Sequence, residues 1–166
     1  IKNTGKNEHV LVYLPFESQD EVMKILQQIP NVHFKQYAPN ISDEDKGNVA
    51  LRKSNYAGFK QDLQTASGVI CNSGFELISE CLHIGVPILT KPLNGQMEQH
   101  SNALALEQLQ YAEVVKTLSL ANIQQWCLSD KKTVTKPLPD VAGAIADAIV
   151  NSQWHNPQQL SDKLWI

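Results

Sequence analysis

Short apolar runs alternate with helical segments along most of this chain, and the alternation limits the folds that the sequence can adopt. The first run, His9–Phe16 (HVLVYLPF), is nearly continuous and rich in β-branched and aromatic residues, as in strands buried on both faces. A Ser-x-x-Glu pattern at Ser18 then opens a stretch of helical spacing that Pro30 ends, and we interpret Ser18 as the helix cap. Further strands are expected over residues 32–37, 49–53, 68–71, 86–90 and 112–115. Further helices are expected over residues 56–66, 75–84, 97–109, 119–129 and 139–152.

This pattern predicts an α/β fold with a doubly wound, parallel, six-stranded Rossmann-like sheet and helices on both faces. Right-handed crossovers, wound in two halves around the first strand, give the strand order 3-2-1-4-5-6. Residues 39–48 (PNISDEDKGN) are turn-rich and acidic, so a surface loop is expected there. Because ligands of such sheets bind outside the carboxyl ends of the strands, the predicted site lies in loops 15–18, 53–56, 72–76 and 91–97.

The chain length fits a single domain with short flanking segments. Its 166 residues and 18.5 kDa are the size of about one domain. Residues 1–8 are predicted to be a linker, residues 9–152 the domain, and residues 153–166 a C-terminal tail. The chain starts at Ile1 rather than at methionine, so we expect it to be a piece of a longer protein. The tail is too apolar for a free solvated terminus, since it carries Trp154, Leu160, Leu164, Trp165 and Ile166.

Composition and charge exclude several classes of protein. The formal net charge of −3 and the pI near 5.9 disfavour nucleic-acid binding, which normally uses a basic patch. No apolar run approaches the roughly 18 residues of a membrane-spanning helix, and no signal-peptide pattern is present, so a cytoplasmic protein is expected. Cys71, Cys81 and Cys127 are an odd number without a CxxC pair, which disfavours a disulfide scaffold and a structural zinc site.

The turn Asn72-Ser73-Gly74 is the most informative candidate loop. A glycine between a strand and a helix lets the backbone approach a ligand, and the free amides of the helix start attract an anion such as a diphosphate. Glu80, six residues after Gly74, could accept both hydroxyls of a ribose. Each feature also has a plain structural reading, because Gly74 could simply make a tight turn and Glu80 could be a solvated helix residue.

The loop Pro92–Gln99 (PLNGQMEQ) is rich in amide and carboxyl groups for a strand-to-helix junction. Such groups suit a polyhydroxylated ligand, whose hydroxyls donate and accept hydrogen bonds at once. The alternative is a solvated turn in which Glu98 favourably occupies the first turn of the following helix.

Together these segments form a recognisable order of motifs. The stretch SGVICNSGFELISECLHIGVPILTKPLNGQMEQHSNALALEQL resembles the nucleotide-sugar-binding signature in the C-terminal domain of GT-B glycosyltransferases. It is similar to the lipid II-forming N-acetylglucosaminyltransferase and UDP-glucuronosyltransferase-like families. The matching elements are Ser73-Gly74, Glu80, Gly85-Val86-Pro87, Pro92, Gln96, Gln99 and Asn102-Ala103.

The resemblance implies a role for each matching residue. Ser73 and Gly74 would hold the diphosphate at the start of the following helix, and Glu80 would bind the ribose. Asn72 belongs to the same nucleotide-sugar-binding set. Gln96 and Gln99, with Glu98 assisting, would contact the sugar or its phosphate. The stretch 54–56, which contains Asn55 and Tyr56, falls where family members hold the base through backbone groups.

Two departures from the family pattern stand out. The first strand-to-helix loop, Pro15-Phe16-Glu17-Ser18, lacks the glycine- or serine-rich turn that many relatives place near the phosphates. Glu76 puts a carboxylate in the first turn of the helix that would face the diphosphate, where it would repel the ligand unless it points away.

The resemblance implies the donor-binding half of a glycosyltransferase of hexosyltransferase type that uses a nucleotide sugar, with UDP as the expected nucleotide. No metal, no cofactor beyond the donor and no catalytic residue are expected in this chain, because the general base of such enzymes lies in an N-terminal domain. The tail would cross back to that acceptor-binding domain, through which any membrane association would also occur. Two alternatives remain open: half of a UDP-sugar 2-epimerase, and a degenerate GT-B-like module that only mediates interactions.

Overall fold

The computed structural model describes residues 9–151 and 156–165 of the chain. The predicted linker over residues 1–8 therefore lies outside the described residues, as do Trp154 and Ile166 of the tail.

The chain divides into two compact units, residues 1–136 and 137–166. The first unit contains the sheet, and the second contains α6 (Val141–Val150) and α7 (Pro157–Leu164). The helix expected over residues 139–152 corresponds to α6, which lies in the second unit and not in the unit that contains the sheet. Pro157 opens α7 at the first helical position, where its missing N–H costs no hydrogen bond.

The first unit is built on a seven-stranded sheet in the order β3-β4-β2-β1-β5-β6-β7. All neighbours are parallel except β3 and β4. The six strands expected from the sequence are β1, β2, β4, β5, β6 and β7, and their observed order confirms the predicted order 3-2-1-4-5-6. The strand bounds are β1 His9–Tyr13, β2 Phe34–Ala38, β3 Glu44–Lys46, β4 Val49–Lys53, β5 Ala66–Asn72, β6 Ile88–Lys91 and β7 Glu113–Val114.

The seventh strand, β3, corrects the prediction of a loop over residues 39–48. It pairs antiparallel with β4 across the two-residue turn Gly47-Asn48, in which Gly47 has a φ of +65°. The ion pair between Arg52 Nη1 and Asp45 Oδ1, 2.7 Å long, links the two strands. An edge strand without a buried face needs no apolar alternation, so the hydrophobic pattern could not reveal it.

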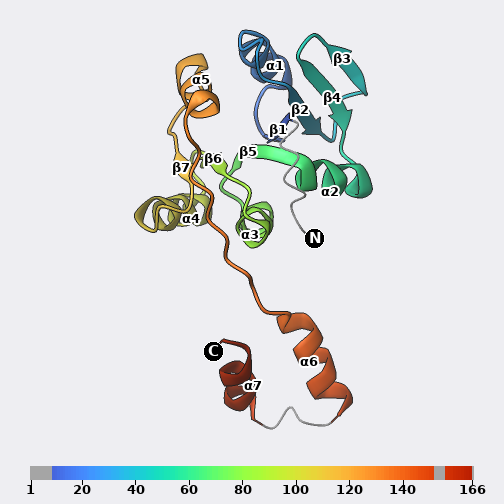
Figure 1. Cartoon of the computed structure of the whole chain (residues 1–166), viewed down its shortest axis with the longest axis vertical. Coiled ribbons are helices and arrows are strands. Elements are labelled where there is room, and N and C mark those ends of the chain that lie inside the picture. The colour runs from blue at the N-terminus through green and yellow to red at the C-terminus, as the bar shows by residue number, and fades with distance from the viewer. Residues whose placement is uncertain (1–8, 152–155, 166) are drawn as a thin grey trace. The chain divides into compact units, whose positions relative to one another are not determined.

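Helices cover both faces of the sheet, as predicted. The helices α1 and α5 pack on one face, and α2, α3 and α4 on the other (Figure 1). Successive β1 residues alternate between the two layers, because Val10 and Val12 join the cluster with α1 and α5 while Leu11 joins the cluster on the opposite face. The helix bounds in this unit are α1 Gln19–Gln27, α2 Tyr56–Thr65, α3 Phe75–Ile84, α4 Met97–Gln108 and α5 Leu120–Leu128. None of the described helices is long and apolar enough to cross a membrane.

Helix caps were predicted from the sequence at the end of α3 and at the start of α1. Gly85 ends α3 in the left-handed conformation, with a φ of +75°, as expected for a glycine at that position. Ser18 stands at the N-cap of α1, but its side chain makes no capping hydrogen bond, so the predicted capping box does not form. Gln19 instead ties the loop, since its Nε2 donates to the carbonyl oxygens of Leu14 and Glu17, both at 2.8 Å.

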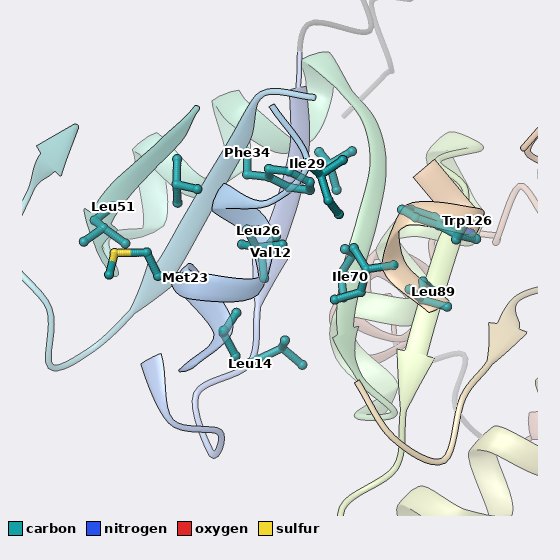
Figure 2. Packing of buried hydrophobic residues seen from close by; sticks show 14 residues of the cluster. Val12, Leu14, Met23, Leu26, Ile29, Phe34, Leu51, Ile70, Leu89 and Trp126 are labelled. Atoms are coloured by element: carbon teal, nitrogen blue, oxygen red, sulfur yellow. The ribbon is translucent and has the colours of Figure 1, made fainter. Parts of the chain in front are cut away.

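The core on the α1–α5 face contains a close approach between a strand and a helix. Figure 2 shows Trp126 of α5 among the buried side chains that include Ile70 and Leu89. A Cβ atom on Gly68 of β5 would lie 2.5 Å from Cη2 of the buried Trp126 ring. The ring can therefore pack on the strand only where the strand carries no side chain.

Replacing Gly68 with alanine is expected to destabilise the fold, because the new methyl group clashes with a ring that the core holds in place. Overpacking of this kind costs about 1–3 kcal/mol, which lowers the melting temperature by several degrees in thermal unfolding. The control is Gly74→Ala, whose Cβ would meet nothing within 4 Å. Equal melting temperatures for the two variants would contradict this account of the core.

Candidate functional site

A cleft of about 690 Å³ opens at the carboxyl ends of the parallel strands. Its walls come from the segments that follow β1, β4 and β5, which include residues of the predicted loops 15–18, 53–56 and 72–76, and from Glu98 and Gln99 of α4. The predicted loop over residues 91–97 contributes none of the described lining residues. The cleft thus lies where the winding of the sheet reverses, between β1 and its neighbour β5.

Most of the residues predicted for the site line this cleft. Seven of the nine do so: Asn55, Tyr56, Asn72, Gly74, Glu80, Glu98 and Gln99. The other two, Ser73 and Gln96, are not among the lining residues, since Ser73 is fully buried and Gln96 is exposed at the N-cap of α4.

The backbone of Ser73 is held on both sides by α4. Oε1 of Gln99 accepts a hydrogen bond from the Ser73 amide at 3.2 Å, and Nδ2 of Asn102 donates to the Ser73 carbonyl at 3.0 Å. Because residues three apart on a helix share a face, Gln99 and Asn102 reach the two peptide groups that flank Ser73. Two residues of the sequence motif therefore fix the turn after β5.

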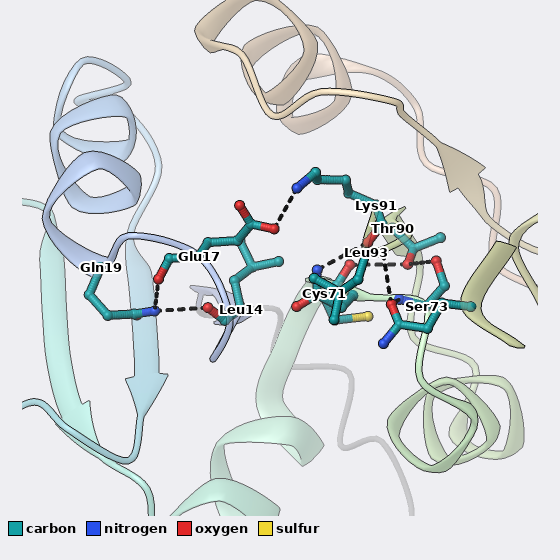
Figure 3. Close-up of polar contacts among 10 residues, drawn as sticks. Leu14, Glu17, Gln19, Cys71, Ser73, Thr90, Lys91 and Leu93 are labelled. Carbon is teal, nitrogen blue, oxygen red and sulfur yellow. Dashed lines mark hydrogen bonds and ion pairs between the residues drawn. The ribbon is translucent and has the colours of Figure 1, made fainter. Parts of the chain in front are cut away.

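The hydroxyl of Ser73 is also occupied within the protein. It lies 2.9 Å from Oγ1 of Thr90, and Thr90 Oγ1 donates its one proton to the Cys71 carbonyl at 3.0 Å (Figure 3). Ser73 must then be the donor to Thr90. Both the amide and the hydroxyl of the buried Ser73 are therefore engaged within the protein, and its hydroxyl links the end of β5 to β6.

Gln99 joins two loops of the site. Its Oε1 also accepts from the amide of Leu93, at 3.0 Å, so the same oxygen ties the loop after β6 to the turn after β5. Its Nε2 makes no hydrogen bond with the described residues, and Gln99 lines the cleft, so this amide can donate to a ligand.

Gly74 opens α3 at the cleft without strain or crowding. Its φ of −71° is accessible to any residue, and a Cβ atom there would meet nothing within 4 Å. No side chain caps the helix at this position, so the first amides of α3 have no side-chain acceptor. Open space beside uncapped amides at the positive end of a helix is suited to an anion.

Glu80 lies in the second turn of α3 and forms an ion pair with Lys60 of α2. Both line the cleft, with 28% and 15% of their side-chain surfaces exposed. The Lys60 ammonium also lies 5.3 Å from the centroid of the Tyr56 ring, a cation–π contact one helical turn away. Sequence reasoning missed Lys60, because nothing in the chain order shows that α2 and α3 face each other here.

The two asparagines at the cleft differ in what they can offer a ligand. Asn55 is the N-cap of α2, since its Oδ1 accepts from the Gly58 amide at 2.7 Å and its Nδ2 donates to the Lys53 carbonyl at 3.2 Å. Its side chain is thus engaged. Asn72 donates through Nδ2 to the Lys91 carbonyl at 3.1 Å, while its buried Oδ1 has no hydrogen-bond partner among the residues that the structure describes.

The first loop contributes an apolar wall in place of a glycine-rich turn. Pro15 and Phe16 line the cleft, and Glu17 pairs with Lys91 at the end of β6, with Oε1 and Nζ 2.5 Å apart (Figure 3). Aromatic side chains also missed by sequence reasoning complete this wall. They are Tyr13, Phe59 and Phe75.

The cleft holds no activated thiol. Cys71 lies on its lining, but burial raises the pKa of this thiol to about 12, so the group is neutral at physiological pH.

Among the described residues, the lining carries three carboxylates, of Glu76, Glu80 and Glu98, and one ammonium, of Lys60.

The chain is similar in sequence to a known family and in fold to solved structures. The sequence model of the family described as glycosyl transferase family 1 matches residues 2–129. The fold is similar to the crystal structure of the glycotransferase of kitacinnamycin, with a TM-score of 0.56 and 19% identity over 75% of this chain and 35% of that chain. It is also similar to MurG of Acinetobacter baumannii, with a TM-score of 0.52 and 15% identity over 71% of this chain and 39% of that chain. This chain therefore spans little more than a third of the length of either protein. No curated protein matches the sequence significantly.

Replacing Gln99 with leucine is expected to loosen the site, because the buried Ser73 amide and the Leu93 amide both lose their acceptor. A buried donor left without a partner costs about 1–3 kcal/mol. Thermal melting would show the loss of stability, and hydrogen exchange would show faster exchange at Ser73 and Leu93. Gln99→Glu keeps an acceptor oxygen and should be closer to the parent, whereas equal exchange at these amides in Gln99→Leu would contradict the assignment.

Proposed function

The chain belongs to glycosyl transferase family 1, and on this basis we propose that its first unit binds the nucleotide-sugar donor of a glycosyltransferase. The proposed donor is a UDP-sugar, held in the cleft at the carboxyl ends of β1, β4, β5 and β6. The fold agrees with the C-terminal domain of GT-B enzymes, as the sequence resemblance implied.

The uncapped N-terminus of α3 is the observation that carries this proposal. A diphosphate placed beside Gly74 would accept hydrogen bonds from the first amides of α3 and would lie at the positive end of the helix dipole. During sugar transfer the same amides would stabilise the charge that develops on the leaving diphosphate. The Ser73 amide does not belong to this set, because Gln99 already occupies it.

The other parts of a nucleotide sugar have suitable partners around this position. The carboxylate of Glu80 can accept ribose hydroxyls, and Nε2 of Gln99 can donate to the sugar or its phosphate. Tyr56 has 80% of its surface exposed on the lining, so its ring is available for stacking on a base. Backbone groups of residues 54–56 would complete the contact with the base.

The remaining parts of the enzyme are proposed to lie outside this chain. The acceptor site and the general base would come from an N-terminal domain, and α7 with Trp165 would form part of the connection to it. The isolated chain would then bind the donor without turnover.

The acidic lining favours a second candidate function. Glu76 and Glu98 are exposed on the cleft and would repel a diphosphate, as expected for a GT-B-like module that has lost its donor and only mediates interactions. Donor binding decides between the two functions.

Calorimetric titration of the chain with UDP, UDP-sugars and GDP tests the proposed function. We expect saturable UDP binding that is weakened by Glu80→Gln, because the neutral amide replaces a charged acceptor. Hydrogen bonds to charged groups contribute about 1.5–3 kcal/mol, so the affinity should fall roughly 10- to 150-fold. Absence of binding by every nucleotide would favour the interaction module, and tighter binding of GDP than of UDP would overturn the choice of base.

Gly74→Ala is expected to weaken UDP binding without lowering stability, because its methyl group would fill the space reserved for the diphosphate. A steric conflict of this size costs about 1–3 kcal/mol, which corresponds to roughly 5- to 150-fold in affinity. Gly47→Ala is the control, since Gly47 is not among the described residues that line the cleft, while its φ of +65° makes the substitution strained. It should melt at a lower temperature than the parent and bind UDP equally well. If Gly74→Ala binds UDP as tightly as the parent, the diphosphate does not lie beside Gly74.

A further inference from the structure

Lys60 has a distinctive position in the cleft. Among the described residues that line it, Lys60 is the single cationic side chain, whereas three lining residues carry carboxylates. It comes from the second turn of α2, and its ammonium is paired with Oε1 of Glu80 from the second turn of α3. The contact therefore connects the two helices that enclose this part of the cleft.

The ion pair with Lys60 involves only one of the two carboxylate oxygens of Glu80. Oε1 is held by Lys60, whereas Oε2 makes no hydrogen bond with the described residues. A carboxylate can accept several hydrogen bonds, so Oε2 and the remaining lone pair of Oε1 stay available for hydroxyl donors. The direction in which they point is set by the lysine.

A cation–π contact and burial restrict Lys60 itself. Its ammonium lies 5.3 Å from the centroid of the Tyr56 ring, and only 15% of its side-chain surface is exposed. A glutamate with three rotatable bonds would otherwise lose conformational freedom when it bound a ligand. A lysine already held in place removes much of that cost before the ligand arrives.

We infer that Lys60 is a positioning residue for ribose recognition: it holds Glu80 by Oε1 so that the carboxylate is oriented toward the ribose hydroxyls. This inference rests on the proposed function, because it requires a nucleotide in the cleft. Lys60 also offsets one of the three negative charges that a diphosphate would meet there.

The test compares the affinities of UDP and 2′,3′-dideoxy-UDP for the 166-residue chain. The ratio of the two affinities reports recognition of the ribose hydroxyls. Both nucleotides carry the same diphosphate, so the attraction of the diphosphate to a positive charge contributes equally to both affinities and does not change their ratio. The parent is expected to prefer UDP by about 10- to 150-fold. Lys60→Met keeps the length of the side chain without its charge, and should lower this preference about tenfold.

Two variants separate positioning from general effects of charge and stability. Lys60→Arg retains a cation that can hold the carboxylate, and should keep the preference for UDP. The matched control is Lys35→Met, which breaks the 2.6 Å ion pair of Lys35 with Asp62 on residues that do not line the cleft. It should leave the ratio at the parent value. If Lys60→Met fails to fold in thermal melting, Lys60→Leu takes its place.

A double-mutant cycle that combines Lys60→Met with Glu80→Gln then measures the coupling between Lys60 and Glu80. Lys60→Met should have little further effect on the ratio once Glu80 is replaced, since it acts through that carboxylate. An unchanged or increased ratio in Lys60→Met would overturn the inference, and an increase would show that Lys60 competes with the ribose. A parent that binds both nucleotides equally overturns the inference but leaves nucleotide binding intact. A parent that binds neither overturns the proposed function and this inference together.

Discussion

The pairing of β1 with β5 is the contact on which the rest of the first unit depends. Residues His9–Tyr13 align in parallel with Ala66–Cys71, and the sheet extends from this pair in both directions. Because the winding reverses there, α1 lies on one face and the helices that follow β4, β5 and β6 lie on the other. The loops after β1 and β5 consequently diverge, and the cleft occupies the space between them.

The cleft keeps its form through side chains that contact the backbone. Gln99 and Asn102 hold the peptide of Ser73, and Thr90 receives the Ser73 hydroxyl. Among the described residues, no side chain caps α3 at Gly74, so the first amides of the helix have no side-chain acceptor. The turn at Ser73 is thus fixed by hydrogen bonds, while the first backbone amides of α3 have no side-chain acceptor among the described residues. This is the arrangement that the proposed diphosphate site would require.

Predictions from the sequence were correct where the pattern within one strand or helix is sufficient to identify it. The apolar runs predicted six strands, and the handedness of crossovers then gave their order, which the structure confirms. The prediction was wrong about residues 39–48, because the edge strand β3 has no buried face and so no hydrophobic pattern. The motif led to Gly74, Glu80 and Gln99, all of which line the cleft. The motif did not show that Ser73, unlike these three residues, is buried and does not line the cleft. A sequence motif shows which residues are present but not which hydrogen bonds they make.

The fold class, the strand order and the edge of the sheet where the cleft lies could be predicted from the amino-acid sequence, because they follow from local periodicity and from the chirality of the chain. Which residues line the cleft and which are buried behind it depends on the folded structure. Lys60 meets Glu80 across 20 positions of the chain, and Ser73 meets Gln99 across 26. Such contacts depend on how the helices pack against the sheet, and helix packing depends on many side chains at once.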